Sequence, residues 1–218
     1  MATPSPASSR SSPAVFVVGL TGGIGSGKTL VSTSLQSLGA AIVDTDLIAH
    51  ALTAPGGAAM KPIAERFGAD FVTADGALDR KKMRELAFTS AAAKRDLEGI
   101  LHPLIRVATE AQAAQATKSA PYVVLVIPLL IEAGNWEKRV DRVLVVDCSS
   151  TTQIERVRRR SGLDAEAVRK IIAQQATRQA RLDAAHDVVV NEGDTQALAR
   201  RVVRLHDLYS RLAAARLH

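Results

Sequence analysis

The residues whose types and spacing best suit chemistry lie near the start of the chain. The run GGIGSGKT matches the pattern G-x-x-x-x-G-K-[ST]. Its glycines can adopt positive φ and let backbone N–H groups surround an anion, and a following helix adds the positive end of its dipole. We expect the lysine to bridge the β- and γ-phosphates of a nucleoside triphosphate and the threonine hydroxyl to bind Mg²⁺. The predicted phosphate-binding residues are Gly22, Gly23, Ile24, Gly25, Ser26, Gly27, Lys28 and Thr29.

Asp44 and Asp46 follow the next apolar run. The carboxyl ends of parallel strands meet at one edge of a sheet, so both side chains are expected beside the phosphates. The two-residue period of a strand would turn them to the same side. A carboxylate there can accept the proton of an attacking hydroxyl, which contributes about 10²–10⁴-fold, or help to hold a metal. Capping of a following helix is the alternative role for either aspartate.

A basic segment lies between Gln153 and Arg181. It holds eight basic and three acidic residues, which account for five of the chain's six net positive charges. A mobile basic segment that closes over a nucleotide supplies guanidinium groups to the transferring phosphoryl and excludes water. Arg156 and Arg160 lie one helical turn apart on a predicted helix. A solvated helix face and a nucleic-acid patch are the alternatives, and the second lacks aromatic residues for base stacking.

Other reactions of phosphate-binding loops fit less well. The chain has no Asn-Lys-x-Asp guanine motif, which argues against a GTPase. The apolar run that ends at Ile127 is followed by Pro128 rather than by the acidic residue of a motor or helicase.

The pattern of apolar residues supplies the elements that must position these groups. Apolar runs at 15–20, 40–43, 122–127, 142–147 and 187–190 predict strands, and the segments between them predict helices. Breaks are expected near Gly68, at 75–76 and at 99–103, and Asp194 is expected to cap the last helix. We therefore predict an α/β fold, a P-loop NTPase-like parallel sheet flanked by helices. The expected parts are a flexible tail at 1–13, a nucleotide-binding core at 14–50, 119–150 and 186–218, a helical substrate-side insertion at 51–118 and a helical lid at 151–185.

Composition sets the outer limits. The chain has 218 residues, 47% of them hydrophobic and 23% charged, which excludes wholesale disorder and a coiled coil. The single cysteine, Cys148, allows no internal disulfide and favours a reducing compartment. The longest apolar run falls far short of the roughly 18 residues of a membrane helix. The net charge of +6 favours an anionic partner.

These motifs, in this order, resemble the dephospho-CoA kinase family. The resemblance rests on VGLTGGIGSGKT from Val18 to Thr29, DTDLIA from Asp44, LHPL from Leu101, IPLL from Ile127 with Glu132, VVD from Val145, QQATR from Gln174 and VNEG from Val190. It implies that ATP, with Mg²⁺, phosphorylates the ribose 3′-hydroxyl of dephospho-CoA to give CoA and ADP, the last step of coenzyme A biosynthesis. A monomer in the cytoplasm, with no nucleic-acid or membrane partner, is the matching expectation.

The resemblance also implies roles for single residues. The catalytic group would be Asp46, Lys28, Arg156 and Arg160. Besides the phosphate-binding residues, ATP would contact Arg178, Asn191 and Gly193, and the acceptor would contact Asp44, His102, Pro128 and Leu129. The chain departs from the family pattern at Thr29, where many relatives have serine, and at Thr45, where alanine is common. Another nucleoside or nucleotide kinase, or a nucleic-acid-binding P-loop module, stays open as an alternative.

Overall fold

The centre of the molecule is a five-stranded parallel sheet in the order β2-β3-β1-β4-β5. The computed structural model describes residues 15–116, 118–134 and 139–216, so the predicted tail at 1–13 lies outside the described residues. The chain moves from β1 to one side for β2 and β3 and then to the other side for β4 and β5, so the order reverses at β1. Ligands of such sheets bind at the carboxyl ends of the strands at this reversal. The strands are β1 (Val17–Thr21), β2 (Ala41–Asp44), β3 (Val123–Val126), β4 (Arg142–Asp147) and β5 (Asp187–Val190).

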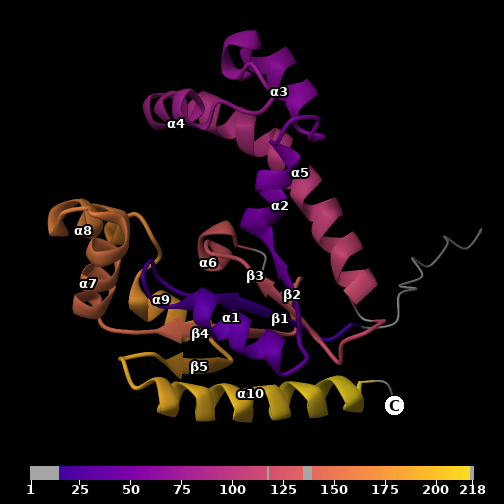
Figure 1. Ribbon diagram of the computed structural model, residues 1–218, viewed down its shortest axis with the longest axis vertical. Coiled ribbons are helices and arrows are strands. Elements are labelled where there is room, and N and C mark those ends of the chain that lie inside the picture. The colour runs from indigo at the N-terminus through magenta and orange to yellow at the C-terminus, as the bar shows by residue number, and fades with distance from the viewer. Residues whose placement is uncertain (1–14, 117, 135–138, 217–218) are drawn as a thin grey trace, which may run out of the picture.

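Helices cover both faces of the sheet, which explains why the strands are almost continuously apolar. On one face, Leu35 of α1 (Lys28–Ser37) and Tyr209 of α10 (Thr195–Ala215) are fully buried against β1, β3 and β4. On the other face, α6 (Leu130–Ala133) and the second half of α5 (Ala91–Ala116) pack against the same strands. Figure 1 shows α10 along one side of the sheet and α5 and α6 on the other.

A helical subdomain between β2 and β3 has its own core, in which Ile63 and Met83 are buried. No strand forms among its described residues, as predicted, and only an isolated bridge joins Val72 to Leu78. The expected break at 99–103 is wrong, because α5 runs straight through it with Pro103 inside the helix. Packing on both sides of this point overrides the proline. The subdomain contains α2 (Thr45–Leu52), α3 (Met60–Phe67), the 3₁₀ turn η1 (Ala69–Phe71), α4 (Arg80–Thr89) and the first half of α5.

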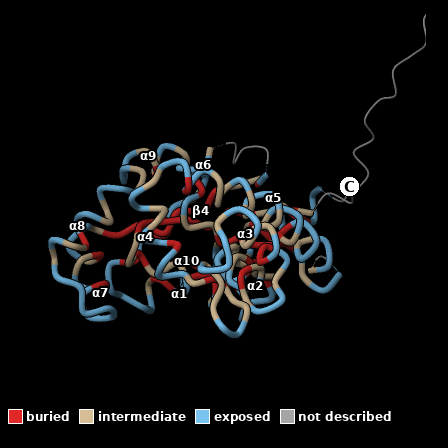
Figure 2. Tube along the Cα trace, turned by 90° about the horizontal axis from the view of Figure 1, so that it is seen from above, coloured by how far each residue is buried: buried red, intermediate tan, exposed pale blue. Residues whose placement is uncertain are grey.

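The predicted lid consists of helices that stand beyond the carboxyl ends of β4 and β5 (Figure 1). They are α7 (Ser150–Ser161), α8 (Ala165–Ala173) and α9 (Arg178–Asp183). Figure 2 shows buried positions concentrated in the sheet, whereas α7 and α8 are mostly exposed or half-buried. Asp194 caps α10 by accepting a hydrogen bond from the backbone N–H of Ala197, as predicted. None of the helices in the described ranges is long and apolar enough to cross a membrane.

Candidate active site

The glycine-rich loop joins the end of β1 to the start of α1. Gly25 and Gly27 have φ of +74° and +96°, in the left-handed region that favours glycine. A Cβ at Gly27 would lie 2.3 Å from Nδ2 of Asn191, so a side chain there is excluded. Asn191 itself is buried and donates from Nδ2 to the carbonyl of Ser26 at 2.8 Å. The loop is therefore fixed by a residue from the other end of the chain, which places Asn191 behind the loop.

Lys28 lies folded over this loop. Its ammonium donates to the carbonyl oxygens of Gly22 at 2.7 Å and Gly23 at 3.3 Å. Burial lowers the pKa of Lys28 and the positive charge of Arg181 lowers it further, while Asp46 acts in the opposite direction. The Ser26 hydroxyl is buried and has no hydrogen-bond partner in the described part of the chain. A buried polar group without a partner requires an explanation, and an anion in the loop provides one.

The two aspartates differ in their local structure. Asp44 caps α2, since its Oδ1 accepts from the N–H of Asp46 at 2.8 Å and of Leu47 at 3.3 Å. Asp46 lies in the first turn of that helix, so the two-residue strand period expected for the pair is wrong. Burial raises the pKa of Asp46 and the neighbouring Asp44 raises it further, whereas Lys28 lowers it. The charges of Asp46 and of Lys28 in the loop therefore interact.

The predicted lid arginines occupy different positions. Arg156 donates to the carbonyl oxygens of Gly25 at 3.5 Å and Ser26 at 3.4 Å, and to Oδ1 of Asn191 at 3.4 Å. Arg160 lies one turn further along α7, and its charge reaches the site because it helps to lower the pKa of Lys28.

Arg178 forms a bidentate ion pair at the carboxyl end of β4. Its Nε donates to Oδ1 of Asp147 at 2.9 Å and its Nη2 to Oδ2 at 2.6 Å. This pair raises the pKa of Arg178. The carboxylate is buried while 60% of the arginine side chain stays exposed, so the outer edge of the guanidinium remains accessible.

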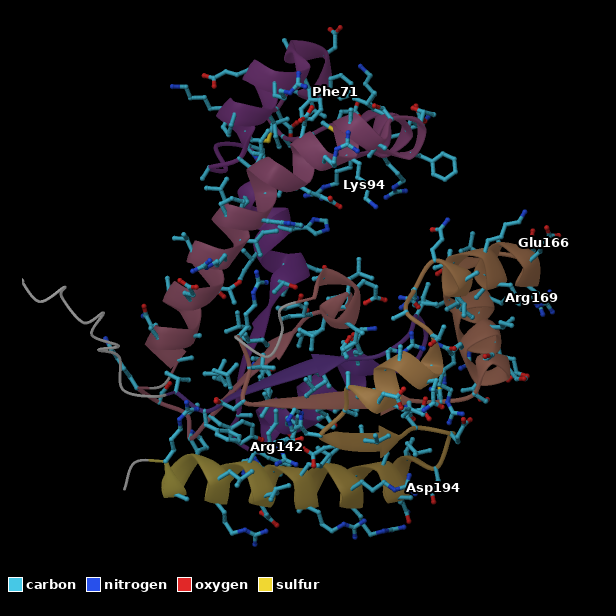
Figure 3. The ribbon with its side chains drawn as sticks, turned by 180° about the vertical axis from the view of Figure 1, so that it is seen from behind. Phe71, Lys94, Arg142, Glu166, Arg169 and Asp194 are labelled. Carbon is cyan, nitrogen blue, oxygen red and sulfur yellow. The ribbon has the colours of Figure 1, made fainter. Side chains whose placement is uncertain are left out.

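The outer part of the basic segment, around α8, does not face the site. Figure 3 shows Glu166 and Arg169 at the outer tip of the lid, away from the sheet. Lys170 forms an exposed ion pair with Glu166 at 2.9 Å. This part of the segment fits the alternative of a solvated helix face.

Two glutamines for which the sequence predicted no role bind the backbone of the loop, and a third such residue, Arg181, lies beside it. Gln175 accepts from the N–H of Ile24 at 2.9 Å, and Gln153 donates from Nε2 to the carbonyl of Ile24 at 2.8 Å. Arg181 is buried next to Gly23. The sequence signal was limited to the QQATR run, which contains Gln175 but does not indicate its partner.

The acceptor-side residues fall into two groups. The carbonyl of Pro128 accepts from Oγ1 of Thr21 at 3.1 Å, and Leu129 is 52% exposed at the start of α6. Both residues therefore follow the carboxyl end of β3, beside the loop. His102 lies in α5 between residues that pack in the subdomain core, so it belongs to the helical subdomain and not to the sheet. Gly193 follows Asn191 after β5 with a φ of +111°.

The described residues contain no cluster of three or more His, Cys, Asp or Glu side chains that could hold a metal without a ligand. The glycine-rich loop, the carboxylates after the next strand and the arginines of α7 and α9 gather at the reversal point of a parallel sheet. This arrangement defines a P-loop kinase.

Comparison with known proteins identifies the kind of kinase. The chain belongs to the dephospho-CoA kinase family, whose model, described as dephospho-CoA kinase, matches residues 16–197. The dephospho-CoA kinase of Burkholderia lata is 58% identical over 202 residues, which cover 92% of this chain and 99% of that protein. The dephospho-CoA kinase of Aromatoleum aromaticum is 55% identical over 201 residues, covering 92% of this chain and 96% of the relative.

Solved structures share the fold. A crystal structure of a Thermus thermophilus protein superimposes with a TM-score of 0.73 at 29% identity, covering 89% of this chain and 97% of the other. The dephospho-CoA kinase of Campylobacter jejuni has a TM-score of 0.65 at 24% identity over 89% of this chain and 97% of its own, which shows the fold. The chain is thus an ATP-using kinase, a phosphotransferase that acts on an alcohol group.

Proposed function

We propose that this kinase transfers the γ-phosphoryl group of ATP to the ribose 3′-hydroxyl of dephospho-CoA, giving CoA and ADP. The observation that carries the proposal is the Asp46 carboxylate at the phosphate-binding loop, where it and Lys28 act on each other's pKa. The relatives at 55–58% identity bear the name of this reaction. A carboxylate beside the γ-phosphate suits an alcohol acceptor, since the hydroxyl has a proton to lose.

ATP binding draws on the loop and on the lid. The backbone N–H groups after Gly25 and the N-terminal end of α1 would bind the β-phosphate. The unpartnered hydroxyl of Ser26 would gain an acceptor there. Lys28 exchanges its two loop carbonyls for phosphate oxygens. Arg156 and Asn191 lie together on the β5 side of the loop, which supports a position for the adenine of ATP on that side.

In the transfer step, Asp46 accepts the 3′-hydroxyl proton as the oxygen bonds to phosphorus and the bond from phosphorus to the ADP oxygen breaks. Burial and Asp44 raise the pKa of this carboxylate, which makes it a better proton acceptor than an ordinary aspartate. Arg160 and the exposed edge of Arg178 supply positive charge to the phosphoryl oxygens when the lid closes.

The residues at the loop fit a bound Mg²⁺. The Thr29 hydroxyl and the Asp44 carboxylate line the same hollow beside the loop, and magnesium in kinases is held by one or two such oxygens plus substrate phosphates and water. When bound, the ion would neutralise charge on the β- and γ-phosphates. Thr29 supplies the hydroxyl that the ion needs.

The test is direct. Purified protein, incubated with Mg·ATP and a panel of acceptors, should phosphorylate dephospho-CoA at the 3′-position with a kcat/KM far above that for nucleosides and nucleoside monophosphates. A folded protein that prefers a nucleoside or nucleotide acceptor would instead establish the alternative of a nucleoside or nucleotide kinase. Retention on nucleic acid that falls steeply with salt and ignores dephospho-CoA would favour the binding-module reading.

We also propose that the enzyme works as a monomer in the cytoplasm. One chain supplies the loop, the carboxylate and the arginines of the site, and the only cysteine, Cys148, is buried and reduced. Sedimentation analysis at assay concentrations should give a mass near 23.1 kDa.

A further inference from the structure

A hollow of about 470 Å³ lies beside the edge strand β2 and adjoins the phosphate-binding loop at Thr29. One end is formed by Thr29 and Asp44, and it continues along α1 to Gln36. Ile42, Leu47 and Gln112 contribute side walls from β2, α2 and α5. Its size falls within the range of small-molecule sites.

The lining shows what kind of group this hollow can hold. Among the described residues that line the hollow, Asp44 is the only charged one, so the hollow is unsuited to a phosphate. Leu47 leaves 68% of its surface exposed there, which gives an apolar wall. Gln36 and Gln112 supply carboxamides, each with two donors and an acceptor. This combination suits a flat, neutral group with an apolar face and a hydrogen-bonding edge.

The backbone of β2 adds further hydrogen-bonding groups. The N–H of Ala41 donates to the carbonyl of Tyr122, so Ala41 turns toward β3. Successive residues of a strand alternate in direction, so the N–H and C=O of Ile42 point to the outer side, where the hollow lies. An edge strand offers such groups to any ligand that lies along it.

The position of the hollow identifies which nucleotide would use it. β2 and β5 form opposite edges of the sheet, and Asn191 follows β5. A hollow at the β2 edge is therefore on the side opposite the adenine of ATP. Leu47, which lines it, follows Asp46 directly in α2, so a ribose with its 3′-hydroxyl at Asp46 has its base within reach.

We propose that this hollow is the subsite for the adenine base of the acceptor, with Gln36 and Gln112 reading the edge of the base and Leu47 packing on its face. Glutamine carboxamides pair with the N6 and N7 positions of adenine in this way. The inference rests on the proposed function and adds to it the residues that choose the base.

Base discrimination provides the first experiment. The kcat/KM for dephospho-CoA is compared with that for its deaminated analogue, which carries hypoxanthine. Each of Gln36→Leu and Gln112→Leu should reduce the preference for adenine about 3–10-fold, the value of one net hydrogen bond, with the KM for ATP unchanged. Gln115→Leu, an exposed glutamine one turn further along α5, is the matched control and should leave the preference intact. Unchanged preference in both variants would overturn the proposal.

Filling the hollow provides the second experiment, which does not depend on hydrogen bonds. Ala51 lines the hollow and is exposed, so Ala51→Phe should fold, as a melting curve checks. The variant should lose at least tenfold in kcat/KM, and by the same factor, for dephospho-CoA and for adenosine. A loss confined to dephospho-CoA would assign the hollow to the pantetheine arm and overturn the proposal, as would no loss. Wild-type protein inactive on every acceptor would refute the proposed function itself, whereas active protein with unaffected variants would refute the subsite alone.

Discussion

At the scale of single residues, Asp46 shows how its surroundings raise the pKa of a carboxylate. Burial and Asp44 disfavour its charged form while Lys28 favours it, so its pKa depends both on a neighbour two residues away and on a residue of the preceding helix. Asp46→Asn should lower kcat about 10²–10⁴-fold, because the proton of the acceptor loses its destination. ATP affinity, measured by titration calorimetry, should change little. Equal losses in kcat and in ATP affinity would instead indicate a structural or metal-binding role.

The pH dependence follows from the same contacts. Since the pKa of Asp46 is raised and the base form is needed, kcat/KM should fall on the acid side at a higher pH than for an ordinary aspartate. Asp44→Asn removes one of the causes that raise this pKa, so the acid limb should move to lower pH in assays at saturating Mg²⁺, which offset the loss of a proposed magnesium ligand. Asparagine caps helices as well as aspartate, so α2 should persist.

The control for this shift is Asp164→Asn, which changes another capping aspartate, at the start of α8. Its pH profile should match that of the wild type. An acid limb that stays in place in Asp44→Asn would show that Asp46 is not the titrating base.

At this scale, what sequence could predict depends on how local the signal is. The glycine-rich turn from β1 into α1 was predictable because its residues are contiguous and its positive φ values demand glycine. Gln153 and Gln175 were not, since their partner is the backbone of Ile24, which has no side-chain signature.

At the scale of elements, helix α7 combines two faces with different tasks. Arg160 contributes to the potential at Lys28, while Arg159, one residue earlier, is exposed on the outer side next to Gly162. Arg160→Ala should reduce kcat about 10²–10³-fold, as loss of one charge-stabilising donor does. Arg159→Ala should have no effect under the same conditions. Equal effects in the two variants would mean that α7 acts only through its net charge.

The contact between lid and loop is a second property of α7. Gln153 is buried, and its carboxamide meets the carbonyl of Ile24. Gln153→Leu leaves that carbonyl without its partner, so it should lower the free energy of unfolding by about 1–3 kcal/mol and raise the KM for ATP. Denaturant titration and initial rates measure the two effects. Gln179→Leu, which removes an exposed glutamine of α9, should be neutral in both; an unchanged KM in Gln153→Leu would separate the lid from ATP binding.

The elements themselves were largely predictable, because buried parallel strands and amphipathic helices each leave a periodic pattern. All five strands form where apolar runs predicted them. The failure at 99–103 has a physical cause, since Gly99 and Pro103 are local helix breakers whereas the packing that keeps α5 whole comes from two separate cores.

At the scale of the whole molecule, α5 is the helix that the sheet core and the helical subdomain share. Its first half packs in the subdomain core and its second half on the sheet, and Pro103 lies between them. Proline has no N–H, so the carbonyl of Gly99 lacks its helical donor at this junction. We predict that α5 bends here when the subdomain closes on the acceptor.

Pro103→Ala restores the missing donor, and alanine is about 3 kcal/mol more favourable than proline inside a helix. The free energy of unfolding should therefore rise by about 1–3 kcal/mol while kcat falls, because a stiffer α5 resists bending. Gly99→Ala is the matched control: its added Cβ meets nothing within 4 Å, and it stabilises the helix by about 1 kcal/mol without supplying the N–H. Hydrogen exchange across 99–103 should slow far more in Pro103→Ala than in Gly99→Ala. If both variants gain stability and both keep full turnover, the proline is a tolerated defect of α5 and the hinge lies elsewhere.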